Sequence, residues 1–252
     1  MKKIIAILLS ISSTAWGTGS LDFNGTTSVL TCSNAGTRDL AFREDSAVTI
    51  CAWIRPRGLG ENSRGRIFSR EGNGTTGPAF HVAATNTLQL SINMQTDLLR
   101  ETVDEFVSLN TWQFACVTWT GSVTATTADI YRNGSLPASY STSQDGSNPT
   151  NNSTDDWKIG NNNSAASTFD GQISSVQIWT STQDVASLKE SMWIPGSRVT
   201  DLIGYWPLIR GGAFQDENNR APIFKGANNC EAVVGTTGSD LAPPIMTFTS
   251  AI

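Results

Sequence analysis

The feature that most constrains this chain is a long succession of short strand-like segments, each followed by a turn sequence. Residues 112–119 are rich in aromatic and β-branched side chains, and residues 128–132 run directly into the hairpin sequence Asn133-Gly134. Residues 171–179 alternate apolar and polar side chains, so we expect one face of that strand to be buried and the other solvated. This pattern predicts an antiparallel β-sandwich.

One segment late in the chain has a helical pattern instead. Its apolar residues Val185, Leu188 and Met192 fall on a single helical face. Asp184 can cap the start of this helix, and Pro195-Gly196 can end it. We therefore expect an all-β chain with one short late helix.

The N-terminus has the three parts of a secretory signal: a basic start, an apolar run at residues 4–9, and small residues up to Ala15. Cleavage after Ala15 or Gly17 is expected, which makes residues 1–17 a signal peptide. The alternative is a buried first strand. The run is too short to span a bilayer, and no other stretch is apolar enough, so we expect no membrane span after signal removal. Residues 18–252 then form one secreted or cell-surface domain with a C-terminal extension.

Charge and cysteine content narrow the class of protein further. The net charge is −5 and there is no basic run that could neutralise phosphates, which argues against nucleic acid as a partner. In an oxidising compartment, the four cysteines suggest two disulfides. Buried free thiols are the alternative.

Several segments, taken in order, resemble the laminin-G/pentraxin group of the concanavalin A-like lectin/glucanase superfamily. The resemblance extends from about residue 20 to about residue 210. It implies a two-sheet jelly-roll sandwich, but it is not specific to any ligand. The segments that carry it are 21–25, 48–54, 112–119 followed by 130–134, 159–160 and 169–179.

The resemblance also implies a disulfide pairing. Pentraxins join a cysteine in the second strand to one in the Trp-led strand, and Cys51 and Cys116 stand at those places. Cys32 and Cys230 remain for a second bridge, which would tie the first strand to the C-terminal segment.

The sequence lacks the patterns that catalysis on this fold needs. Glycosidases need two carboxyl groups that face the same cleft. Asp104-Glu105 and Asp155-Asp156 are adjacent pairs, so on a strand their side chains would point to opposite faces. The single histidine, His81, has no nucleophile motif around it, and we interpret it as structural. We therefore predict a protein that is not an enzyme.

Calcium is the one cofactor that we consider. The resemblance places the pentraxin calcium positions at residues 74–77 and 161–164, where the carboxylates are absent and only the amides of residues 161–163 remain. One interpretation is a single, weaker calcium site formed by Asn162 and Asn163 with Asp170 or Asp145. The other is that this Asn run serves only the loop itself. No Cys/His cluster has zinc-ligand spacing.

We predict that the chain is a secreted binding module that recognises a glycan or an extracellular surface protein through loops at one end of the sandwich. Trp157 is the best candidate for an exposed aromatic ring, with core packing as its alternative. An alternative function is a structural or adhesive subunit of a virion or cell envelope, in which the chain forms a homo-oligomer. The predicted loops are 72–77, which contains Asn73, 141–156, and 161–168, which begins with Asn161.

Overall fold

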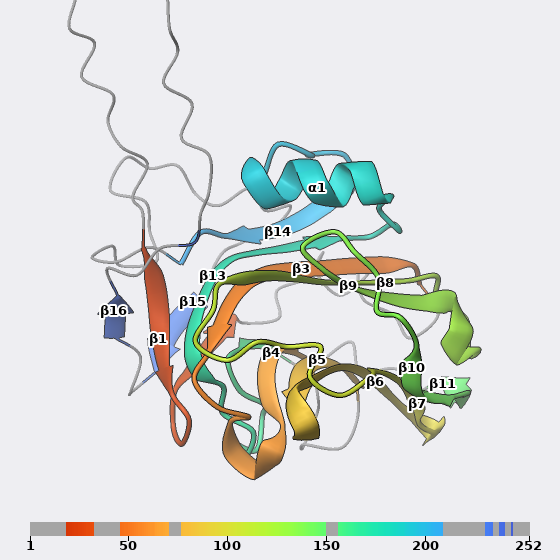
Figure 1. Cartoon of the computed structure of the whole chain (residues 1–252), viewed down its shortest axis with the longest axis horizontal. Helices are drawn as coiled ribbons and strands as arrows, with labels where there is room; N and C mark the ends of the chain where they lie inside the picture. Colours follow the sequence, from red (N-terminus) through yellow and green to blue (C-terminus); the bar gives the residue numbers. More distant parts are fainter. Residues whose placement is uncertain are drawn as a thin grey trace, which may run out of the picture.

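The computed structural model describes residues 19–32, 46–70, 77–149, 156–208, 230–233, 237–239 and 243. The predicted signal peptide therefore lies outside the described residues. Within them the fold is an antiparallel two-sheet sandwich with one α-helix, as the strand and turn pattern predicts (Figure 1).

The first sheet has seven strands in the order β16-β1-β13-β3-β8-β9, with β14 also paired to β13. In its central strand β13, Ile173, Val176 and Ile178 belong to the inter-sheet core, but the polar residues Gln172 and Gln177 are buried as well, so the expectation of one solvated face is wrong. The strands are β1 (Ser20–Asn24), β3 (Val48–Pro56), β8 (Gln113–Trp119), β9 (Ala128–Arg132), β13 (Asp170–Trp179), β14 (Leu202–Trp206) and β16 (Thr237–Ser239).

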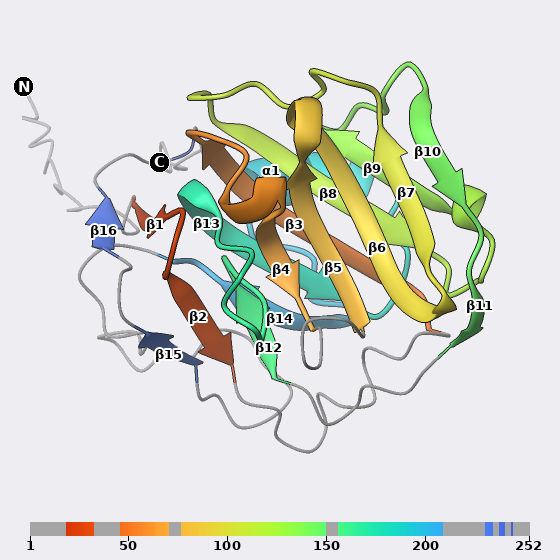
Figure 2. The ribbon, with the colours of Figure 1, turned by 90° about the horizontal axis from the view of Figure 1, so that it is seen from below.

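The second sheet has nine strands in the order β10-β7-β6-β5-β4-β12-β2-β15, with β11 paired to β6 (Figure 2). Short 3₁₀ turns precede β4, β6 and β9: η2 (Glu61–Ser63), η3 (Ala84–Asn86) and η4 (Ala125–Thr127). The strands are β2 (Val29–Cys32), β4 (Gly65–Ser69), β5 (Gly77–Ala83), β6 (Thr87–Thr96), β7 (Leu98–Thr102), β10 (Tyr140–Gln144), β11 (Ser147–Pro149), β12 (Trp157–Ile159) and β15 (Cys230–Val233).

Two strands lie where we expected only loop. Residues 141–156 were predicted to be a loop because they are polar, but β10 pairs with β7, and β11 pairs with β6. Backbone pairing at a sheet edge does not require an apolar side chain, because one or both faces of an edge strand can remain in water. The prediction of one long loop is therefore wrong for these two strands.

Apolar side chains fill the space between the sheets. Phe23 and Phe169 meet edge to face there, with ring centroids 6.4 Å apart, and neither ring is exposed. A second apolar cluster lies on the other face of the seven-stranded sheet, beneath helix α1 (Val185–Trp193) (Figure 1). The helix covers that face, whereas the outer face of the nine-stranded sheet points away from it (Figures 1 and 2).

Two local predictions are confirmed under this helix. Asp184 caps α1, because its side chain accepts a hydrogen bond of 2.7 Å from the backbone N–H of Ser187. Cys51 and Cys116 form a disulfide between β3 and β8. They are directly opposite in the ladder, with a Cα–Cα distance of 4.2 Å.

The second predicted disulfide concerns the edge of the nine-stranded sheet. The antiparallel register of β2 and β15 places Cys230 directly opposite Cys32. The Cys32–Cys230 bridge stays a prediction, and this register agrees with it.

Candidate functional site

The predicted loops do not share one end of the sandwich. Strand β12 runs antiparallel to β4, with Lys158 opposite Ser69 and Ile159 opposite Phe68, so β12 ends beside the start of β4. Loop 161–168 follows β12 there and bonds to the β3–β4 connection, where the N–H of Glu61 donates to Thr168 over 2.9 Å. Ser69 at the end of β4 and Gln144 at the end of β10 lie at the opposite end of the sheet, so the described residues do not bring the three predicted loops together in one cluster.

The loop amides are used within the loop itself. Asn161 is fully buried, and its Oδ1 accepts hydrogen bonds from the N–H groups of Asn162 and Ser167. Asn162 Oδ1 accepts from the Ser164 hydroxyl and the Ala166 N–H. These are the bonds expected of the loop-chemistry interpretation. They occupy the Asn162 oxygen that we had considered for calcium, and they bury Asn161, which we had considered for ligand binding.

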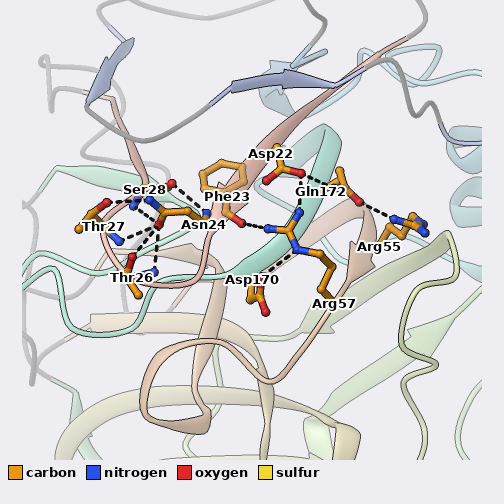
Figure 3. Close-up of polar contacts among 10 residues, drawn as sticks. All are labelled: Asp22, Phe23, Asn24, Thr26, Thr27, Ser28, Arg55, Arg57, Asp170 and Gln172. Carbon is orange, nitrogen blue, oxygen red and sulfur yellow. Dashed lines mark hydrogen bonds and ion pairs between the residues drawn. The ribbon is translucent and has the colours of Figure 1, made fainter.

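Asp170 belongs to a different arrangement, which Figure 3 shows. Arg57 Nε donates to Asp170 over 3.0 Å, its Nη1 donates to Asp22 over 2.6 Å, and its Nη2 donates to the Phe23 carbonyl. The hydrogen bond to Asp22 is the main reason that the pKa of Arg57 is raised, with Asp170 adding to it. Gln172 joins this network by donating to Asp22. Asp170 therefore serves as a structural ion-pair partner between β1, β3 and β13.

The remaining predicted site residues are dispersed. Asp145 lies at the far end from Asp170, where its carboxylate accepts the Ala125 N–H over 2.8 Å, so the two carboxylates do not meet. Trp157 is fully buried between Phe68 and Trp206. The ring therefore packs in the core, which was our alternative, and is not exposed to a ligand. Asn73 lies outside the described residues.

A different set of polar side chains lies together on the outer face of the nine-stranded sheet. The registers of β4, β5, β6, β7 and β10 place these residues side by side across five strands. Their neighbours along each strand, such as Phe80, Val82 and Leu90, belong to the inter-sheet core, so this set faces away from it. We call it the polar row: Arg66, His81, Gln89, Glu101 and Thr142.

Hydrogen bonds hold the carboxylate of the polar row in place. The Thr87 hydroxyl donates to Glu101 Oε1 over 2.6 Å. Gln89 Nε2 and the Thr142 hydroxyl donate to Oε2 over 3.2 and 3.3 Å. Glu101, Gln89 and Thr142 are half-buried, so their groups are both oriented and open to solvent.

The other end of the polar row is cationic and closed. His81 is only 1% exposed, and neither ring nitrogen has a hydrogen-bonding partner. Burial lowers the pKa of His81 well below its usual value, and the charges of Arg66 and Arg64 lower it further. The imidazole is therefore neutral at pH 7. Gln89 and the Ala79 carbonyl oppose this effect only slightly.

A lysine extends this polar surface toward β2. Lys158 lies in the next row, opposite Ser69 and Thr31, and its ammonium donates to the Thr31 hydroxyl over 2.9 Å. Burial lowers the pKa of Lys158, and Asp156, 3.9 Å away, partly restores it. The face therefore offers donors, acceptors and a cation.

The chemistry of this face suits hydrogen bonding better than hydrolysis. The polar row holds one carboxylate, whereas a glycosidase needs a pair. In the part of the chain that the structure describes, no three His, Cys, Asp or Glu side chains are grouped as a metal site would require.

Sequence reasoning missed the polar row, although one pattern hinted at it. In residues 79–82 and 88–92, polar residues alternate with apolar ones. That alternation identifies an outward face, but only the strand pairing shows that His81, Gln89 and Glu101 are neighbours.

The fold and this surface define a β-sandwich of the lectin type without a recognisable catalytic pair among the described residues. A laminin-G profile of the concanavalin A-like lectin/glucanases superfamily matches residues 24–188. The chain belongs to this superfamily, as its ordered motifs indicated.

Two solved structures show the same fold. A putative carbohydrate-binding protein from Bacteroides ovatus superposes with a TM-score of 0.62 at 18% identity, over 91% of this chain and 62% of that one. The native heptameric SAP-like pentraxin from Limulus polyphemus superposes with a TM-score of 0.54 at 16% identity, over 92% of this chain and 98% of the pentraxin. No curated protein sequence matches the chain. None of the helices in the described ranges is long and apolar enough to cross a membrane.

Proposed function

We propose that this chain is a secreted, non-catalytic binding module that recognises a glycan on the outer face of its nine-stranded sheet. The observation that carries the proposal is the polar row, in which Glu101 is oriented by three hydrogen bonds and remains half-buried. A carboxylate accepts from sugar hydroxyls, and the Gln89 amide both donates and accepts. Fixed groups of this kind recognise hydroxyl patterns without reorganising when the ligand binds.

The geometry of the sheet favours an extended ligand. Neighbouring strands are about 4.8 Å apart, so the two gaps from Gln89 across Glu101 to Thr142, the half-buried part of the polar row, span roughly 10 Å. That length matches a short oligosaccharide better than a single sugar ring. The Bacteroides ovatus structure, described as a putative carbohydrate-binding protein, agrees with this ligand class through its fold alone.

A glycan array with and without added calcium tests the proposal, followed by calorimetry on the strongest ligand. Gln89→Ala is expected to weaken binding about tenfold, which corresponds to about 1.4 kcal/mol for one lost hydrogen-bonding group. Gln183→Ala is the matched control, because Gln183 is also half-buried but lies beside α1 on the other side of the sandwich. Absence of binding to any glycan in either condition contradicts the proposal.

Calcium and assembly remain separate proposals. We infer that any calcium site in loop 161–168 would have to draw on backbone carbonyls and Asn163, because the Asn162 oxygen is already bonded. Native mass measurement addresses the alternative function. A ring or larger assembly that binds no glycan favours a structural subunit, and a glycan-binding monomer disfavours it.

A further inference from the structure

The polar row contains one group that neither the fold nor the proposed binding explains. His81 is enclosed, and its neighbours Phe80 and Val82 are core residues. Neither ring nitrogen makes a hydrogen bond of normal geometry, although weaker contacts with Gln89 and the Ala79 carbonyl oppose the lowering of its pKa. A buried polar group without a partner is costly, and a buried charge without a counter-ion is much more so. This position therefore tolerates imidazole only in its neutral form.

The charges around His81 all act in the same direction. Arg66 is directly opposite it on β4, and Arg64 lies immediately before that strand. On the other side, Gln89 of β6 is neutral. The nearest carboxylate across the sheet, Glu101 of β7, is one strand further on and is already bonded to Thr87, Gln89 and Thr142. Among the described residues of these strands no anion adjoins the ring, and the charges that act on it are those of Arg66 and Arg64.

We infer that His81 is a proton-controlled switch in the binding face. The neutral ring packs at the cationic end of the polar row. The protonated ring forces β4, β5 and β6 out of their packed arrangement and releases the ligand. The release of ligand in acid rests on the proposed function. The loss of packing in acid can be tested without any ligand.

The direction of the pH dependence of folding stability follows from the difference in proton binding between the folded and unfolded chain. Because the folded-state pKa is lowered, the unfolded chain binds the proton more readily than the folded chain. The contribution of His81 to the free energy of unfolding is fully present above the pKa of the unfolded chain, about 6.5. It is lost as the pH falls toward the pKa of the folded chain. One proton changes the unfolding constant by at most about tenfold per pH unit in that window.

The test is simple because His81 is the single histidine of the chain. Proton NMR of its ring gives the folded pKa directly. Denaturant unfolding between pH 4.5 and 7.5 is then compared for wild type, His81→Gln and His81→Phe, the second of which keeps a ring that cannot titrate. We expect a folded pKa below the usual histidine value of about 6.5, and a slope of at most about tenfold per pH unit that both variants lose.

In a second experiment, the affinity of wild type and His81→Gln for the strongest glycan is measured over the same pH range. Wild-type affinity is expected to fall as the pH drops below the unfolded-state value of about 6.5, while His81→Gln retains its affinity. A ring pKa of 6.5 or above, or the same pH profile in both variants, overturns the switch. Glycan binding that strengthens in acid also overturns it, because it would mean that the ligand supplies the missing anion. Loss of stability in acid without binding of any glycan leaves the switch standing and refutes the proposed function instead.

Discussion

Removal of the Cys51–Cys116 disulfide gives the largest effect that the structure allows us to estimate. The bridge joins residues that are 65 positions apart, so in the chain-entropy model it removes about 4 kcal/mol of unfolded-state freedom. Both cysteines are buried beneath α1, in the same cluster as Trp53 and Phe114. We therefore expect the Cys51→Ala/Cys116→Ala protein to lose about 4 kcal/mol of unfolding free energy.

Thermal and denaturant unfolding measure this loss. For a domain of this size, 1 kcal/mol lowers Tm by roughly 2–4 °C, so the double variant should melt about 8–16 °C lower. The single variants Cys51→Ala and Cys116→Ala are the controls, because each keeps one sulfur but cannot form the bridge. If the cross-link is the source, all three variants lose similar amounts. A loss below about 1 kcal/mol in the double variant would refute the reasoning, and a loss confined to one single variant would point to packing instead.

Three further predictions concern other parts of the fold. Arg57→Gln should cost about 1–2 kcal/mol in urea unfolding, a modest value because its ion pairs are partly exposed; no change would mean that solvent replaces them. Trp157→Phe should cost about 1–2 kcal/mol, since the ring is fully buried, and an unchanged Tm would contradict its place in the core. Non-reducing peptide mapping should recover Cys32 linked to Cys230, and a free thiol at either position would refute that bridge.

Much of the fold could be predicted because its determinants are local. Strand β13 carries an alternating pattern, and α1 has an apolar face with Asp184 at its start. These features depend on side-chain periodicity and capping, which a short window of sequence contains. Cys51 and Cys116 were paired through the family resemblance, and the register of β3 and β8 confirms that pairing.

The candidate site could not be predicted because its determinants are not local. Asp145 and Asp170 were alternative carboxylates for one calcium site, yet the direction of the strands places them at opposite ends of the sandwich. The polar row depends on the registers of β4 to β10, and a shift of one residue in any strand would turn its side chain into the core. Trp157 begins a strand of three residues, which is too short to reveal which face is buried.

The most direct test of the central claim is an NMR titration of the isotope-labelled protein with its strongest array glycan at pH 7. The account predicts that the largest amide shifts fall on β5, β6 and β7 around His81, Gln89 and Glu101, and that Gln89→Ala reduces them while Gln183→Ala does not. Shifts centred on loop 161–168 or beside α1, with the polar row unchanged, would contradict it.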